Sequence, residues 1–418
     1  MRFAAYLCSV PTADHQPIAS LRLLHVSDLH LGYRQYQRLT PGGINQREAD
    51  VAATFRTTID RMIALEPDVV VVAGDVFHTV RPTNQAIVHA FVQFSRLVQA
   101  LPRTSVVLVA GNHDTPRSTE TGGILQLFTQ LGVHVVDREA RRIPFPARSL
   151  SLLCVPDVPG LVVPSLTPDP AARINVLVVH GEVQGILPVN LAVADPAAVQ
   201  ITREELTSGQ WDYIALGHYH VYREVASNAF YSGSIDYTSV NTWGELYEQR
   251  VAKLNGKGFV ERDLTTGEHV FHELPPARPL VDLPSLAVAG LTAPAVDKAI
   301  RSIVDACPGG IDDKIVRLVV RDLTRSLARE LDHKAIRDYK RRALVFNLDV
   351  RPPETRIMRT SAGGAPGRRP SLVDIVREQL AARPLDADID RALLIERAVG
   401  YLEDAQLTFA LPTPGADG

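Results

Sequence analysis

Cysteines and long apolar segments are scarce in this chain of 418 residues. The three cysteines, Cys8, Cys154 and Cys307, are scattered without metal-ligand spacing. Such an odd, sparse set argues against a disulfide framework and fits a reducing compartment, so we expect a cytoplasmic protein. No run approaches the ~18 apolar residues of a transmembrane helix, which predicts a soluble protein. The apolar stretch at the N-terminus is too short for a signal peptide, and we interpret residues 1–20 as an N-terminal extension.

Charge of one sign is also lacking. The formal net charge is −3, with 22% charged and 45% hydrophobic residues. No global positive field therefore indicates nucleic acid or an anionic membrane, and any basic surface must be local or supplied by a partner. The length predicts two or three domains.

What the chain does contain is a set of apolar runs that end in polar residues. In the stretch Val106-Val-Leu-Val-Ala-Gly-Asn-His-Asp114, β-branched residues predict a buried strand, and Gly111 allows a sharp turn where it ends. A strand followed by an ordinary Asn-containing turn is the simpler interpretation of this stretch alone. The rest of the chain argues against it.

Five predicted strands in series end in residues that bind metals or move protons. They supply Asp28 and His30 (strand 21–26), Asp75 (69–73), Asn112, His113 and Asp114 (106–110), His180 (174–179), and His218 and His220 (211–216). Strand carboxyl ends converge on one edge of a helix-covered sheet, so these side chains are expected to meet. Imidazoles, carboxylates and a carboxamide suit borderline or hard divalent ions, and the set is large enough for two ions bridged by one Asp. Such a site predicts phosphoester hydrolysis.

The same residues carry a family resemblance. Asp28-Leu-His30, Gly74-Asp75, Gly111-Asn-His-Asp114, His180-Gly181 and Gly217-His-Tyr-His220 resemble, in order, the five signatures of calcineurin-like metallophosphoesterases. The resemblance implies an α/β fold, a four-layer β-sandwich flanked by helices. It implies one ion on Asp28, His30, Asp75 and His220, and a second on Asp75, Asn112, His180 and His218. His113, oriented by Asp114, would act on the phosphate or the leaving group.

Two longer stretches, Ser27-Asp-Leu-His-Leu-Gly32 and Gly74-Asp-Val-Phe-His78, resemble the SbcD nucleases of DNA double-strand-break repair. This resemblance implies that His78 assists at the phosphate, although a surface residue at a helix start is the alternative. It also implies two Mn²⁺ ions (with Mg²⁺, Fe²⁺ or Zn²⁺ as alternatives), action on DNA, an SbcC-like coiled-coil ABC-type ATPase as partner, and a homodimer through helices near residues 83–130. The segment 233–245 keeps the Gly-Ser after the last histidines but then departs from the family pattern, which leaves the subfamily and the substrate open.

The domain boundaries are inferred from composition and periodicity, and the resemblance implies what each domain is. After the extension at 1–20, we predict a metallophosphoesterase domain at 21–274, a small α/β capping domain at 275–355, a linker at 356–370 and a helical partner-binding tail at 371–418. The capping domain shows βαβαβ alternation, with strands at 280–288, 314–322 and 344–350 and helices at 294–307 and 328–341. The tail helices, at 371–383 and 388–405, would dock on a partner or pack on their own chain.

Within the first domain we expect helices at 48–65, 83–99 and 123–130. Residues 230–272 are expected to form short strands with a glycine turn at 255–258. The arginines at 138–148 and the basic run at 340–342 would hold DNA phosphates or simply form solvated faces.

Three interpretations of the function are compatible with the sequence and the resemblance. The first is a DNA exonuclease and endonuclease acting on DNA ends and hairpins, as the nuclease subunit of an SbcCD-like complex. The alternative with the same chemistry is a stand-alone metallophosphodiesterase for nucleotides or small phosphoesters. A non-catalytic scaffold with a decayed site is the third, and the intact ligand set with His113 argues against it.

Overall fold

The computed structural model describes residues 20–116, 123–185, 197–208, 210–353, 372–383 and 390–408. Contacts divide the chain into two compact units, residues 1–353 and 354–418, and each is described by itself. The predicted extension at 1–20, except Ser20, and the predicted linker at 356–370 lie outside the described residues. The domain boundaries drawn from the sequence stay predictions.

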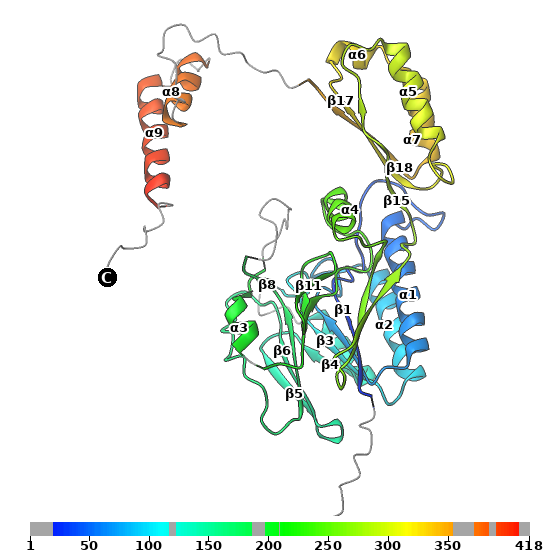
Figure 1. The fold of residues 1–418 in the computed structure, drawn as a ribbon, viewed down its shortest axis with the longest axis vertical. Helices are drawn as coiled ribbons and strands as arrows, with labels where there is room; N and C mark the ends of the chain where they lie inside the picture. Colours follow the sequence, from blue (N-terminus) through cyan, green and yellow to red (C-terminus); the bar gives the residue numbers. More distant parts are fainter. Residues whose placement is uncertain are drawn as a thin grey trace, which may run out of the picture. The chain divides into compact units, whose positions relative to one another are not determined.

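The first of two large sheets has the strand order β14-β13-β1-β2-β3-β4 (Figure 1). Four of its strands are parallel: β1 (Arg22–Val26), β2 (Val69–Ala73), β3 (Ser105–Val109) and β4 (His134–Val136). The hairpin of β13 (Lys257–Asp263) and β14 (His269–Leu274) adds antiparallel strands beside β1. Every residue of β2 is buried, as expected for a continuous β-branched strand covered on both faces.

The second sheet has the order β11-β12-β10-β7-β6-β5. Its elements are β5 (Arg141–Phe145), β6 (Leu150–Val155), β7 (Ile174–His180), β10 (Tyr213–Gly217), β11 (Arg223–Ala226) and β12 (Ala229–Tyr231). The four inner strands β12, β10, β7 and β6 run parallel, and β11 and β5 are antiparallel at the two edges. The carboxyl ends of β7 and β10 therefore lie together.

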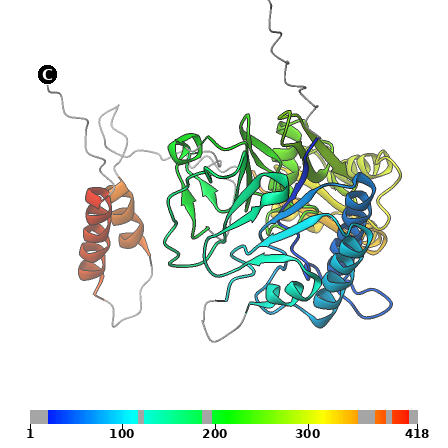
Figure 2. The same cartoon turned by 90° about the horizontal axis from the view of Figure 1, so that it is seen from below.

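The two sheets pack face to face between helical layers. Alternate residues of each strand point to opposite faces, so Leu24 and Val70 face helices α1 (Gln46–Leu65) and α2 (Asn84–Ala100), whereas Leu23 and Val71 face the second sheet. The outer face of the second sheet is covered by residues around α3 (Arg203–Ser208) and the small sheet of β8 (Glu182–Val183) and β9 (Gln200–Ile201). Figure 2 shows α1 and α2 on the outer side of the blue strands. The predicted four-layer α/β sandwich is confirmed.

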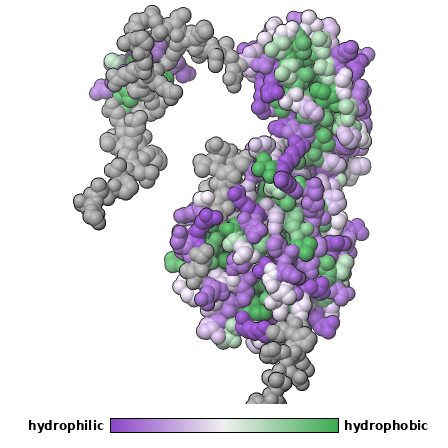
Figure 3. All heavy atoms as spheres, viewed as in Figure 1, coloured by the Kyte–Doolittle hydropathy of each residue, from purple (hydrophilic) through white to green (hydrophobic). Residues whose placement is uncertain are grey.

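A smaller parallel sheet follows in the chain. It consists of β15 (Leu280–Asp282), β16 (Leu286–Ala287), β17 (Ile315–Arg321) and β18 (Val345–Arg351). Helices α5 (Ala293–Asp305), α6 (Arg325–Arg329) and α7 (His333–Arg342) connect its strands, and Val296, Ile300, Leu318 and Phe346 share one buried core. In Figure 3 a band of apolar side chains runs along this part of the molecule.

The structure refines one local prediction and corrects another. The helix expected at 123–130 is present as a 3-10 helix, η1 (Ile124–Leu131). Helix α4 (Thr242–Val251) lies where only short strands were expected, because Asn241 accepts a hydrogen bond from the Gly244 N–H and starts a helix despite the β-branched residues nearby. The arginine-bearing stretch at 138–148, to which the sequence analysis assigned no helix or strand, contains strand β5 and the 3-10 turn η2 (Pro146–Arg148).

Other predicted elements have shifted bounds. Of the glycine turn expected at 255–258, Lys257 and Gly258 lie in β13, and the turn from β13 to β14 is at residues 264–268. The strand expected at 280–288 and the helix expected at 328–341 are each split in two.

The described residues of the second unit form two helices, α8 (Leu372–Ala382) and α9 (Arg391–Thr408), which contact each other. The Nη1 of Arg391 donates hydrogen bonds to the carbonyls of Leu380 (2.6 Å) and Arg383 (2.8 Å), so the start of α9 caps the end of α8. None of the helices among the described residues is both long and apolar enough to cross a bilayer.

Candidate metal centre

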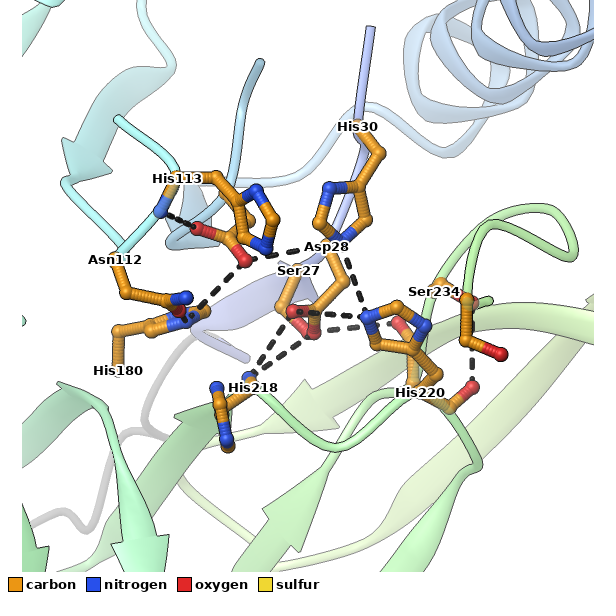
Figure 4. Close-up of polar contacts among 12 residues, drawn as sticks. Ser27, Asp28, His30, Asn112, His113, His180, His218, His220 and Ser234 are labelled. Atoms are coloured by element: carbon orange, nitrogen blue, oxygen red, sulfur yellow. Dashed lines mark hydrogen bonds and ion pairs between the residues drawn. The ribbon is translucent and has the colours of Figure 1, made fainter. Parts of the chain in front are cut away.

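The candidate ligands gather where strands of both large sheets end (Figure 4). Asp28 and His30 follow β1, Asp75 follows β2, and Asn112 and His113 follow β3 of the first sheet. His180 ends β7, and His218 and His220 follow β10 of the second sheet. The site therefore depends on the packing of one sheet against the other, rather than on a single sheet edge.

Four of these residues have left-handed backbone conformations. The φ angles are 53° at Asp28, 45° at His30, 53° at Asp75 and 104° at His218. Each such residue costs about 1–3 kcal/mol and persists only where the surroundings enforce it. The enforcement here is main-chain pairing between neighbouring turns: Asp28 N–H donates to the Gly74 carbonyl and His30 N–H to the Asp75 carbonyl, both at 3.0 Å. The backbone strain is therefore concentrated at candidate ligand residues, as is typical of functional sites.

Two groups of ligand atoms share one centre. The donor atoms of Asp28, His30 and His220 lie within 4.8 Å of one another, as do those of Asp28, Asp75 and His180. Asp28 belongs to both groups, and the Oδ2 of Asp75 lies between His30 of the first group and His180 of the second, 3.6 Å and 3.5 Å from their Nε2 atoms. Nε2 of His30 and Nε2 of His220 face each other at 3.0 Å. The arrangement offers a central carboxylate with imidazoles on either side.

The remaining predicted ligands differ in how they face this centre. Oδ1 of Asn112 is 3.1 Å from Nε2 of His180, which brings the carboxamide into the second group. His218 donates its main-chain N–H to both carboxylate oxygens of Asp28, at 3.1 and 3.2 Å. Its Nε2 lies 3.2 Å from Oε1 of Glu182, and its ring is turned away from Asp28 in Figure 4. A metal held by His218 would therefore bind at Nδ1.

His113 and His78 lie beside the first group. The donor nitrogens of His30, His78 and His113 are all within 4.8 Å of one another. The main-chain N–H of His113 donates to Oδ1 of Asp75 at 3.0 Å, and its Nδ1 is 2.8 Å from the carbonyl of His78. That carbonyl orients the imidazole of His113 toward the ligand cluster.

Asp114 binds main-chain groups of the turns after β2 and β3. Its carboxylate accepts the main-chain N–H groups of Val76 (3.0 Å), Phe77 (2.9 Å) and Gly111 (3.1 Å). These bonds tie the turn after β3 to the turn after β2. Asp114 thereby fixes the backbone that presents His113 and Asp75.

Burial shifts the pKa values of the cluster. Burial lowers the pKa of His180 to about 3 and that of His30 well below its ordinary value, the latter with help from His220. Burial also raises the pKa of Asp75, and raises that of Asp114 to about 8 together with the nearby charge of Asp75. His30 and His180 are therefore neutral near pH 7, the form that binds metals, while the buried carboxylate of Asp75 would gain from a cation. This donor set fits borderline or hard divalent ions.

Two carboxylates that contact the rings of candidate ligands were not predicted from the sequence. Glu182 pairs with His218, and the bond from His218 lowers the pKa of Glu182 to about 2. Oε1 of Glu245, on α4, is 3.2 Å from Nδ1 of His220. Neither glutamate belongs to a spaced motif, and Glu182 is marked in the sequence only by its position two residues after His180. Partners of this kind fix the tautomer of a ligating histidine.

Glycines allow the ligands to approach one another. A Cβ on Gly111 would lie 2.1 Å from Oδ1 of Asp75, and a Cβ on Gly217 would lie 1.7 Å from the carbonyl oxygen of Ala73. A side chain at either position would therefore push the chain at the end of β2, where Ala73 and Asp75 lie, away from its place in the site.

The fold and this cluster define a class of protein. The model of the calcineurin-like phosphoesterase family matches residues 21–238, more than half of the chain. The chain belongs to this family of metal-dependent phosphoesterases, which confirms the predicted superfamily.

Individual proteins similar to this chain are named as DNA repair proteins. A DNA double-strand break repair protein Mre11 of Methanosarcina mazei is 26% identical over 378 residues, covering 80% of this chain and 57% of the relative. Those of Methanocaldococcus jannaschii and Methanococcus maripaludis are 36% identical over 97 residues (23% and 24% of the two chains) and 27% identical over 260 residues (59% and 63%). The chain thus spans less than two thirds of each relative. These relatives are named for DNA double-strand break repair, in agreement with the predicted resemblance to the SbcD nucleases.

The Gly111→Ala variant tests the close approach of the two turns. Its new Cβ would displace the Asp75 carboxylate, and we expect Mn²⁺ affinity to fall about tenfold or more. Isothermal titration calorimetry measures this loss. The control is Gly42→Ala, whose Cβ would have Thr40 Oγ1 as its nearest neighbour at 3.9 Å and should bind Mn²⁺ as the wild type does. Equal affinity of the Gly111→Ala variant and the wild type would contradict the assignment of Asp75 to the centre.

Proposed function

We propose that the chain is a Mn²⁺-dependent two-metal phosphodiesterase that hydrolyses DNA at ends and hairpins, as the nuclease subunit of an SbcCD-like complex in DNA repair and recombination. The observation that carries the proposal is the position of the Asp75 carboxylate between the imidazoles of His30 and His180, which belong to two overlapping groups of metal-ligand type. The similarity to Mre11 proteins, which are named for DNA double-strand break repair, supports DNA as the substrate.

The proposed ligands divide into two sets. One ion would be held by Asp28, His30, Asp75 and His220, and the other by Asp75, Asn112, His180 and His218. Support comes from the 3.0 Å approach of Nε2 of His220 to Nε2 of His30 and from the 3.1 Å approach of Oδ1 of Asn112 to Nε2 of His180. Two bound ions supply a nucleophile at neutral pH and charge stabilisation for the attacking and leaving oxygens.

The protein's own groups would manage the proton and the phosphate. His113 is proposed to give a proton to the leaving oxygen in its protonated form: Nδ1–H donates to the His78 carbonyl at 2.8 Å, and the proton on Nε2 is the one transferred, which leaves the neutral imidazole. The ring of His113 lies beside that of His30, with 4.9 Å between the ring centroids. The neighbouring imidazole of His78 would contact the phosphate. Asp114 would hold the turn that carries His113.

The proposed function is tested by cleavage of end-labelled duplex and hairpin DNA in the presence of Mn²⁺, with a small generic phosphodiester assayed in parallel. For the His113→Ala variant we expect DNA cleavage to fall by a factor of about 10²–10⁴, the usual contribution of general acid–base catalysis, while Mn²⁺ still binds. His333→Ala is the control, since His333 is an exposed residue of α7.

Two outcomes would contradict this assignment. Loss of bound Mn²⁺ in His113→Ala would make His113 a ligand rather than a proton donor. Turnover of the small ester by the wild type, with DNA untouched even in the presence of the ATPase partner, would favour the alternative of a stand-alone metallophosphodiesterase for nucleotides or small phosphoesters.

The second unit is proposed to bind an SbcC-like coiled-coil ABC-type ATPase. Support comes from the helix pair α8 and α9, in which Leu393 and Tyr401 are exposed apolar residues, 48% and 74% accessible. Helices with apolar residues on their surface suit docking in the groove of a partner.

Deleting residues 371–418 should abolish association with such an ATPase, because the proposed docking helices are removed, and should leave cleavage of simple DNA unchanged. Co-purification of the two proteins and the cleavage assay measure the two effects. Undiminished association after the deletion would remove the proposed role of the tail.

We also propose a cytoplasmic homodimer. The proposed dimer face includes α2, on which Val88 and Val92 are 61% and 47% exposed. The unpaired, buried thiols of Cys154 and Cys307 fit a reducing compartment.

A further inference from the structure

The proposed ligand His220 has a buried carboxylate on the side away from the metal centre. Its Nε2 faces Nε2 of His30 at 3.0 Å and Oδ1 of Asp28 at 3.9 Å. Its Nδ1 lies 3.2 Å from Oε1 of Glu245. An ionised carboxylate only accepts hydrogen bonds, so the proton of the neutral imidazole belongs on Nδ1. The lone pair of Nε2 is then directed at the centre.

Lys257 holds Glu245 in the ionised form. Its Nζ is 2.5 Å from Oε2 of Glu245, and both side chains are buried, with 3% and 6% exposure. The same ammonium donates to the carbonyl of His220 at 2.7 Å and to Oγ of Ser234 at 3.1 Å. All three N–H groups of Lys257 are therefore used, and one of them fixes the main chain of the ligand itself.

Contacts of helix α4 and of the residues just before it hold Glu245 in place. Oε1 of Glu245 also accepts the main-chain N–H of Ser239 at 2.8 Å. On the same helix, the ring of Trp243 packs against the guanidinium of Arg317 on β17, 4.7 Å from the ring centroid, and Arg250 pairs with Asp282 on β15 at 3.6 Å. The carboxylate is thus carried by a helix anchored to the small parallel sheet, an arrangement that preorganises it.

We propose that Glu245 and Lys257 are positioning residues for His220, which set its tautomer and the direction of its metal-binding nitrogen. The inference rests on the proposed role of His220 as a metal ligand. The counterpart at His218 is less enclosed, because the side chain of Glu182 is 20% exposed and shares its carboxylate with Gln200, whose Nε2 donates at 2.9 Å. His220 is therefore the ligand with the more tightly determined orientation.

If the pair of Glu245 and Lys257 only joined α4 to β13, a different experimental result would be expected. Such a pair contributes to the stability of the metal-free chain but does not affect how tightly one particular ion binds. A positioning pair determines the affinity of the ion on His220 and leaves the ion on His180 and Asn112 nearly unchanged. The two roles are separated by measuring metal binding and unfolding on the same variants.

The experiment uses the full-length chain and Mn²⁺ alone. The Glu245→Gln/Lys257→Met double variant removes both charges together, so that no buried charge is left without a partner. Glu245→Asp is a milder second variant, which keeps the charge opposite Lys257 but withdraws the carboxylate from Nδ1 of His220. The control is Glu261→Gln, which removes a carboxylate from a histidine outside the site, His272, where the Nε2–Oε2 distance is 2.6 Å.

Calorimetric titration should show one of the two Mn²⁺ sites weakened by a factor of about 10–100 in both Glu245 variants, the usual effect of losing such a carboxylate, and unchanged sites in Glu261→Gln. Unchanged Mn²⁺ affinity at both sites in the Glu245 variants, with a lowered unfolding temperature of the metal-free chain, would overturn the proposal and leave the pair a structural role. Absence of Mn²⁺ binding by the wild type would instead overturn the proposed two-metal function, and this inference with it.

Discussion

The face-to-face packing of two mainly parallel sheets is the constraint on which the metal centre depends. Asp28, His30 and Asp75 follow strands of one sheet, and His180 and His218 lie at the ends of strands of the other, so a small slip between the sheets would separate the ligand groups. The buried imidazole of His25 bridges this interface, with Nδ1 at 2.9 Å from the Tyr213 hydroxyl and Nε2 at 3.2 Å from the Leu216 carbonyl. Around it the apolar core of small and β-branched side chains fixes the spacing of the two sheets.

The centre combines features that would be unfavourable without a ligand. Four residues with left-handed backbone, two buried histidines with lowered pKa and a buried Asp75 with raised pKa meet at one place. Divalent ions would offset these costs, because they stabilise the ionised carboxylate and the lone pairs of the neutral imidazoles. Glu182 and Glu245 contact the outer nitrogens of the proposed ligands His218 and His220, and carboxylates in this position would set which nitrogen of each ring faces inward.

Much of the fold and of the ligand cluster could be predicted from the sequence, because the relevant signals are local. Runs such as Val69–Ala73 mark strands buried on both faces, and the glycine and polar residues that follow directly mark the strand ends. Contacts between distant segments leave no such signal: Glu182 lies 36 residues from His218, and Glu245 lies 25 from His220. Helix α4 was missed because its start depends on the side chain of Asn241, which competes with the strand preference of neighbouring Val240 and Thr242. The roles of individual ligands, the metal and the substrate stay proposals.

Anomalous X-ray diffraction from crystals of the wild-type chain soaked in Mn²⁺ tests the central claim most directly. The account predicts two peaks about 3.5–4 Å apart, one on each side of the Asp75 carboxylate, the spacing typical of two-metal phosphoesterases. The peak nearer His220 should lie on the Nε2 side of its ring, and the peak nearer His218 on the Nδ1 side. A single peak, or two peaks that do not share Asp75, would contradict a bridged two-metal centre.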